Sequence, residues 1–249
     1  MRRNPALAKL NAGGMTSGIS VGLDSPDLAE MAAHAGFDYV WLEWQHGQFS
    51  EHTLNNAIAR FLPVDTAPIV RVKSHEPGAI NHVLDMGAMG VIVPMVETAD
   101  EARAIAHVTY YPPLGRRSTG GTRLPLLGDD YTERANDEML LVVMVETESA
   151  INNVTEIMEV PGVDVVLIGP GDLMLDVQAQ GKDAAYHEQL VQQVLTASQQ
   201  TGVAAGYVCP SLEVADERVA QGFRFVSCGS DTGALRAGFQ SILQHTQTW

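Results

Sequence analysis

Two acidic side chains stand where short apolar runs of the sequence end. Glu146 closes Leu140–Glu146 (LLVVMVE), and Asp172 follows Val163–Gly169 (VDVVLIG) within Gly-Pro-Gly-Asp-Leu. A carboxylate in such a place is poorly solvated unless it has a partner. Mg²⁺ and Mn²⁺ are commonly held by one or two carboxylates, with water and substrate filling the remaining positions, and a bidentate 2-oxo acid would supply two oxygens. We therefore predict that Glu146 and Asp172 are metal ligands.

Both carboxylates also have a purely structural interpretation. Glu146 would serve in a salt bridge or at the N-terminus of a helix over 147–157, and Asp172 would be the N-cap of a helix that Gly-Asp-Leu opens. The neighbouring Gly169 and Gly171 would let backbone amides approach a substrate carboxylate at the start of that helix. The metal prediction requires the two acidic side chains to meet at one place.

A histidine and an arginine are further candidates for chemistry. His46 lies three residues after Glu43 in WLEWQHG, and the carboxylate could orient the imidazole and raise its basicity as a general base. Arg71 interrupts the apolar run PIVRV, and its planar set of donors suits a carboxylate or an enolate oxygen. The structural alternatives are a surface histidine and an ion pair between Arg71 and a barrel carboxylate such as Asp85. A base, an arginine and a metal together favour retro-aldol cleavage beside a 2-oxo group.

Two other features favour structural roles. Ser227–Gly233 (SCGSDTG) resembles a phosphate-binding helix N-terminus, but a Ser/Asp cap explains it better. His75 and His82 lack the compact spacing of a zinc pair, and we interpret both as surface residues.

Eight short apolar runs alternate with segments of helical spacing, and the candidate residues lie where the runs end. The predicted strands are Gly18–Gly22, Phe37–Glu43, Pro68–Val72, Gly90–Pro94, Leu140–Glu146, Val163–Gly169, Val203–Val208 and Phe223–Cys228. The predicted helices are Ser25–Ala35, Ser50–Phe61, Pro77–Met86, Ala99–Val108, Ala150–Val160, Ala185–Gln200, Leu212–Gln221 and Asp231–Gln244. Near-continuous apolar runs are typical of parallel strands covered on both faces. This alternation predicts an α/β fold, a single-domain (β/α)8 TIM barrel over residues 1–249, with the candidate residues on one rim.

One stretch departs from the alternation. Tyr110–Glu138 is rich in proline, glycine and arginine and is predicted to be a long, partly irregular excursion, of the kind that is usually functional. Its arginines include Arg116, Arg117 and Arg123. They would either receive a distal substrate carboxylate or anchor the excursion to a neighbouring subunit.

Composition excludes several classes of protein. Thirty acidic against fifteen basic residues give a net charge of −15, which argues against nucleic acid or an anionic membrane as the main partner. The chain has no apolar run long enough to span a membrane and no signal-peptide core, so we expect a cytoplasmic protein. Cys209 and Cys228 are too few for a disulfide framework and are expected to be buried free thiols.

The motifs resemble those of the HpcH/HpaI aldolase family, the metal-dependent class II pyruvate aldolases, over nearly the whole chain. The most specific segments are VPMVETADEARA, YYPPLGRRSTGG and VETESAINNVTEIMEVPGVDVVLIGPGDL. The resemblance implies a carbon–carbon lyase that reversibly cleaves a 4-hydroxy-2-oxo acid to pyruvate and an aldehyde through a metal-stabilised enolate. The implied cofactor is Mg²⁺, Mn²⁺ or Co²⁺.

The resemblance also implies roles for individual residues. Glu146 and Asp172 would bind the metal, Arg71 would stabilise the enolate, and His46 would belong to the base acting through a water. The backbone around Gly171 and Asp172 would hold the substrate carboxylate, and Asp85 would reach the site of an adjoining subunit. Family members are typically hexamers, dimers of trimers with an exchanged terminal helix, which would give the amphipathic segment 232–244 a partner.

Four positions depart from the family pattern. Its usual base segment reads Asp-Gly-Glu-His, whereas this chain has Glu43, Trp44, Gln45 and His46. The longer Glu43 shifts the carboxylate, and Trp44 must occupy space near the mouth. Met144 stands where many relatives have a glutamine near the metal, so a hydrogen bond is expected to be missing there.

Two other functions fit the same residues. Oxaloacetate decarboxylation, or a citrate-lyase-like cleavage of an acyl-CoA, would keep the metal and Arg71, although the acidic composition disfavours a CoA groove. A barrel without catalysis, serving as a binding module, is the third interpretation, and Trp44 and Met144 are its main support.

Overall fold

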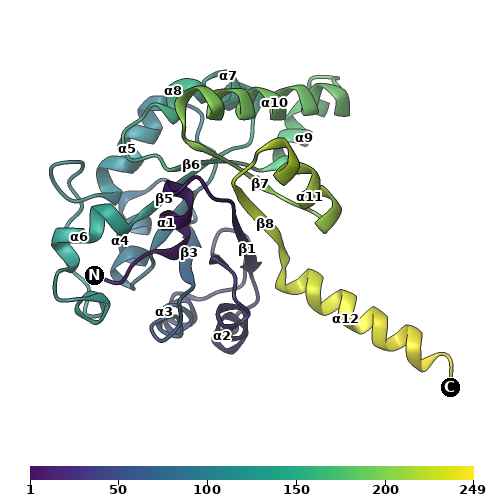
Figure 1. Cartoon of the computed structure of the whole chain (residues 1–249), viewed down its shortest axis with the longest axis horizontal. Helices are drawn as coiled ribbons and strands as arrows, with labels where there is room; N and C mark the ends of the chain where they lie inside the picture. Colours follow the sequence, from purple (N-terminus) through teal and green to yellow (C-terminus); the bar gives the residue numbers. More distant parts are fainter.

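Eight parallel strands form a closed barrel in chain order in the computed structural model, which describes residues 1–249 (Figure 1). The strands are β1 (Thr16–Val21), β2 (Tyr39–Glu43), β3 (Ala67–Arg71), β4 (Gly90–Val93), β5 (Leu140–Val145), β6 (Val165–Ile168), β7 (Ala204–Val208) and β8 (Phe225–Ser230). Each strand pairs with the next, and β8 pairs with β1. The predicted (β/α)8 barrel is confirmed.

Helices cover most of the outside of this barrel. The elements after the first four strands are α2 (Pro26–His34), α3 (Glu51–Ala59), α4 (Pro77–Asp85) and α5 (Ala99–Thr109). The later helices are α7 (Glu148–Asn152), α8 (Val154–Met158), α9 (Pro170–Ala179), α10 (Ala184–Thr201), α11 (Leu212–Gln221) and α12 (Asp231–Thr246). None of them combines the length and hydrophobicity that crossing a bilayer requires.

Three helical segments differ from the sequence-based expectation. The helix predicted over Ala150–Val160 is two short helices, because Asn153 leaves the helical conformation between them and its side chain donates to the carbonyl of Glu97. Helix α9 was expected only as a helix start at Gly-Asp-Leu and is absent from the helices predicted by spacing; it follows β6 without a connecting loop. Helix α1 (Pro5–Asn11) was also missed, because seven residues are too few for a clear helical period.

Side chains fill the barrel interior in place of a channel. The rings of Tyr39 and Phe225 stack with centroids 4.2 Å apart, and Gly18 lies against Tyr39, where a Cβ would overlap the ring. Helix α1 closes the bottom of the barrel with its buried face, which includes Leu7 and Leu10. The interior is therefore a packed core that supports the residues at the opposite, carboxyl-terminal ends of the strands.

The excursion Tyr110–Glu138 contains a short 3₁₀ turn, η1 (Leu124–Leu127), and helix α6 (Tyr131–Glu138). The buried Arg117 donates to Asp85 (2.9 Å) and to the hydroxyl of Tyr131 (3.1 Å). Arg123 donates to the carbonyls of Asn55 and Met86. These two arginines anchor the excursion to the outside of their own barrel, whereas Arg116 is exposed.

Helix α12 leaves the barrel and extends away from it into solvent (Figure 1). It begins at Ser230, whose hydroxyl accepts a hydrogen bond from the Gly233 amide, so the predicted cap at SCGSDTG is confirmed. Because α12 does not return over the sheet, the outward-facing Ile19 and Cys228 are only half-buried. Cys209 is buried as expected, and Cys228 departs from that expectation.

Candidate active site

A cavity of about 360 Å³ opens at the carboxyl-terminal ends of the strands. Its lining residues are Ser20, Trp41, Glu43, Arg71, Met144, Glu146, Gly169, Pro170, Gly171, Asp172, Val208 and Pro210. The four charged side chains among them come from the ends of β2, β3 and β5 and from the start of α9. Six of the site residues predicted from the sequence therefore meet in one place.

Glu146 lines this cavity with only 3% of its surface exposed. Its Oε2 accepts a hydrogen bond of 2.9 Å from the Met95 amide, and Met95 is the one non-glycine residue with a left-handed backbone (φ 54°). Burial raises the pKa of Glu146 to about 7; the Met95 amide and the charge of Arg71 oppose this rise, and the negative charge of Asp172 adds to it. Glu146 is thus a buried carboxyl group with a second carboxyl group beside it.

The start of α9 places Asp172. Gly169 is the N-cap residue, Pro170 occupies the first helical position, and Asp172 is the third residue of the helix. Asp172 is therefore not an N-cap, and no side chain caps α9. A Cβ at Gly169 would overlap Oε1 of Glu146, so a glycine is required where β6 passes the buried carboxylate.

These observations match the requirements of a hard divalent cation. Two adjacent carboxylates repel each other, and a cation between them removes the repulsion and the cost of burying Glu146. The amides of Gly171 and Asp172 lie in the first turn of α9, where helix geometry gives them no acceptor, so both are free hydrogen-bond donors.

Arg71 is held at the edge of the same cavity. Its Nε donates to Oε2 of Glu43 at 2.6 Å, Nη1 lies 3.6 Å from the sulfur of Met144, and the guanidinium carbon is 4.8 Å from the centroid of the Trp41 ring. Arg71 does form an ion pair with a barrel carboxylate, as the structural alternative expected, but the partner is Glu43 and not Asp85, which pairs with Arg117. One N–H of Nη1 and both of Nη2 have no protein acceptor and are available to a substrate oxygen.

Glu43 does not orient the imidazole of His46 in this structure. Its Oε1 accepts the backbone amides of Gln45 (2.7 Å) and His46 (2.8 Å), and its Oε2 accepts from Arg71. The His46 side chain is exposed and does not line the cavity. The expected effect of Glu43 on the basicity of His46 therefore has no geometric support, and Glu43 fixes the loop backbone and the arginine instead.

Trp44 also departs from its predicted place. Only 8% of its surface is exposed, and it packs in the layer between the barrel and the helices, with the ammonium of Lys73 4.5 Å from its ring centroid. The tryptophan in the cavity is Trp41, which the sequence reasoning missed. The signal was present, because Trp41 lies two residues before Glu43 on a strand and so shares its face.

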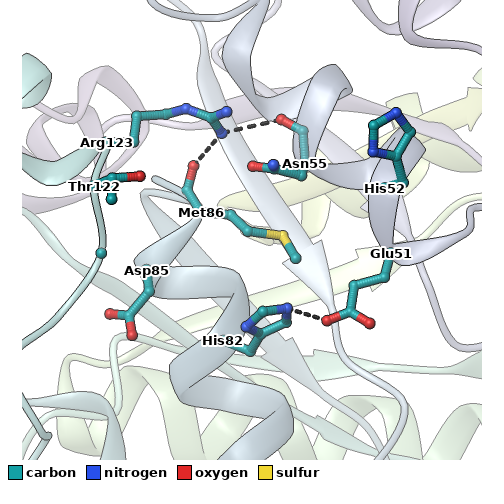
Figure 2. Close-up of a pocket in the computed structure, with 9 residues that line it drawn as sticks. Glu51, His52, Asn55, His82, Asp85, Met86, Thr122 and Arg123 are labelled. Atoms are coloured by element: carbon teal, nitrogen blue, oxygen red, sulfur yellow. Dashed lines mark hydrogen bonds and ion pairs between the residues drawn. The ribbon is translucent and has the colours of Figure 1, made fainter.

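Asp85 lies outside this cavity. It ends α4 and borders a second, polar recess of about 680 Å³ on the outer wall of the barrel. Figure 2 shows Asp85 there with His82, which is ion-paired with Glu51, and with Arg123. His82 is half-exposed, as expected for a surface residue, whereas His75 is partly buried and contacts the Pro94 carbonyl. Within one chain, Asp85 cannot reach Glu146 and Asp172.

A barrel with two carboxylates, an arginine and free helix amides on its carboxyl-terminal rim defines a lyase-type active site, suited to stabilising an enolate. Comparison with known proteins agrees: the chain belongs to the HpcH/HpaI aldolase/citrate lyase family, whose model matches residues 16–237.

Individual relatives cover almost the whole chain. This chain is 33% identical over 248 residues to a 4-hydroxy-2-oxo-heptane-1,7-dioate aldolase from Escherichia coli. The alignment covers 96% of this chain and 93% of the relative. A solved HpcH/HpaI family protein from Burkholderia cenocepacia superimposes with a TM-score of 0.92 at 27% identity, covering 98% and 99% of the two chains. A solved citrate synthase has a TM-score of 0.85 at 28% identity and covers 97% of each chain. The chain is an aldolase-type lyase.

Proposed function

We propose that this enzyme is a divalent-metal-dependent aldolase that reversibly cleaves a 4-hydroxy-2-oxo acid to pyruvate and an aldehyde. The meeting of Glu146 and Asp172 in one cavity with Arg71 carries the proposal. The names of the curated relatives support the substrate class.

Glu146 and Asp172 would hold Mg²⁺, Mn²⁺ or Co²⁺. When bound, such an ion supplies Lewis-acid stabilisation of negative charge developing on the 2-oxo oxygen. The amides of Gly171 and Asp172 would bind the substrate carboxylate, and Gly169 leaves space for Glu146. The free N–H groups of Arg71 would donate to the oxygen that becomes the enolate.

The proton of the 4-hydroxyl must leave as the C3–C4 bond breaks and its electron pair moves into the enolate. We assign that proton to His46, acting through a water because its side chain lies outside the cavity. The released aldehyde departs, and protonation of C3 then gives pyruvate.

Exchange of the pyruvate methyl protons in deuterium oxide tests this proposal without knowledge of the aldehyde. Proton NMR should show metal-dependent exchange by the wild-type enzyme, its loss in Asp172→Ala, and a reduction of about 100-fold in Arg71→Ala. No exchange by the intact, metal-loaded protein would refute the pyruvate assignment.

A second candidate function is decarboxylation of oxaloacetate, and the exposed position of His46 favours it. Decarboxylation requires stabilisation of an enolate but no base for a 4-hydroxyl. His46→Ala should then retain most of the rate while Glu146→Gln loses it, whereas an aldolase should lose activity in both variants. A citrate-lyase-like reaction would break a carbon–carbon bond of an acyl-CoA and leave the thioester intact, so it would be detected as release of a 2-oxo acid from that acyl-CoA.

Binding of Mn²⁺ separates both enzymes from a binding module without a metal. Isothermal titration should show a loss of affinity of at least tenfold in Glu146→Gln, because a neutral amide is a weaker ligand than a carboxylate. Equal Mn²⁺ affinities of the wild-type and Glu146→Gln proteins would support a binding module without a metal.

We also propose a hexamer, a dimer of trimers in which α12 is exchanged between subunits. Leu235, Phe239, Ile242 and Leu243 recur at helical spacing on α12 and are all exposed. A groove of about 530 Å³ lies between β1, β8, the segment after β7 and the first turns of α12, which contribute Gly233, Ala234 and Ala237. In such an assembly Asp85 would serve a neighbouring site. Light scattering should show that Phe239→Asp lowers the molecular mass of the assembly, whereas the exposed Met31→Asp on α2 should not.

A further inference from the structure

The indole of Trp41 forms the floor beneath the arginine of the active site. Its ring centroid lies 4.8 Å from the guanidinium carbon of Arg71, and only 3% of Trp41 is exposed. Glu43 binds Nε of the same guanidinium, and the sulfur of Met144 lies beside Nη1. The arginine is therefore contacted on its face by Trp41 and at two places on its edge.

The position of the Arg71 guanidinium over the indole of Trp41 leaves its N–H groups free. A guanidinium above an indole is attracted by the negative face of the ring, and this attraction uses none of its N–H groups. A second carboxylate in place of Trp41 would hold Arg71 as firmly but would consume the donors on its edge. The cation–π contact restrains the guanidinium and leaves three N–H groups available to a ligand.

The neighbouring strands provide the space that the indole needs. Trp41 is in register with Ser20 on β1 and with Ile69 on β3. Ser20 lines the same cavity, and its small side chain leaves room for the ring at this level of the barrel. The large residue on β2 is thus accommodated by a small residue on β1.

We propose that Trp41 is a positioning residue, which holds the Arg71 guanidinium in the orientation that binds the 2-oxo acid and its enolate. This inference rests on the function proposed above for Arg71. Trp41 acts through the arginine: it supplies no ligand to the metal and takes no part in proton transfer. A lysine at position 71 would lack the planar guanidinium and would have three N–H donors in place of five.

Two measurements test the proposal at saturating Mg²⁺: the rate of pyruvate methyl exchange, and the affinity for oxalate, a planar dianion that resembles the enolate. Trp41→Leu should lower both by about tenfold, the loss expected when a buried cation–π contact is removed. Trp41→Phe keeps a weaker aromatic face and should have a smaller effect. It replaces Trp41→Leu in both measurements if the leucine variant does not fold. Trp44→Phe is the matched control, because Trp44 is buried nearby but does not line the cavity, and it should leave both values unchanged.

A double-mutant cycle distinguishes positioning from general packing. If Trp41 acts through Arg71, Trp41→Leu should cause little further loss in an Arg71→Lys background. Additive losses, or wild-type values in Trp41→Leu, would overturn the inference. Absence of exchange in the wild-type protein would instead refute the proposed function, and the oxalate cycle would still decide whether Trp41 and Arg71 are coupled.

Discussion

Glu43 shows how one side chain organises the rim at the scale of single residues. One oxygen accepts two consecutive backbone amides, and the other accepts Nε of Arg71 at 2.6 Å. Both partners of this ion pair are mostly buried, so water stabilises either charge only weakly. The pair connects the loop after β2 to the arginine on β3.

We predict that Glu43→Gln destabilises the protein by about 3 kcal/mol, because it leaves Arg71 as an uncompensated buried charge. The amide nitrogen of glutamine would also face the Arg71 Nε–H, which is itself a donor. Urea unfolding of both proteins measures the difference. Glu30→Gln is the control, since Glu30 pairs with Arg60 on the surface, and it should cost about 1 kcal/mol or less. Equal effects of the two substitutions would contradict the role of the buried pair.

The start of α9 is the element on which the metal site depends. β6 passes directly into this helix at Gly169, so the backbone that closes the strand also presents Asp172 and two free amides. The buried carboxylate of Glu146 lies against Gly169. Strand, helix and carboxylate are therefore interdependent.

Gly169→Ala should weaken Mn²⁺ binding by about tenfold or more, because the new Cβ displaces the Glu146 carboxylate. Isothermal titration measures the affinity. The same substitution two residues later, Gly171→Ala, is the matched control, since a Cβ there meets no atom within 4 Å. It should retain metal affinity, and similar losses in the two variants would contradict the steric argument.

Asp164 connects distant parts of the whole molecule at the amino-terminal end of the barrel. Its Oδ2 accepts the amide of Leu141 on β5 (2.8 Å) and lies 3.2 Å from the hydroxyl of Tyr110 at the start of the long excursion. Burial raises the pKa of Asp164 to about 7, although both hydrogen bonds oppose the rise. The folded chain therefore binds this proton more tightly than the unfolded chain does.

The sign of the resulting pH dependence follows from linkage. The contribution of Asp164 is fully present below the pKa of the unfolded chain and is lost as pH rises through about 7. We predict that Asp164→Asn removes about 2 kcal/mol of the decline in unfolding free energy between pH 5 and pH 8. Denaturant unfolding of the wild-type and Asp164→Asn proteins at pH 5 and pH 8 measures this difference. An equal decline in unfolding free energy in the two proteins would contradict the prediction. Glu146 titrates in the same range but is common to both proteins.

The sequence by itself determined the barrel and much of its rim. Eight apolar runs require eight buried strands, and the ends of parallel strands converge, so Glu43, Arg71, Glu146 and Asp172 had to approach one another. The sequence was enough to predict this meeting, because each of the four residues lies at the end of, or shortly after, a strand that the apolar pattern marks.

Tertiary structure alone decided which of these residues touch. The partner of Arg71 is Glu43 and not Asp85, because α4 carries Asp85 away from the rim while β2 and β3 place Glu43 and Arg71 in register. The path of α12 and the burial of Trp44 likewise depend on packing between elements far apart in the chain, which a local pattern of residues does not encode.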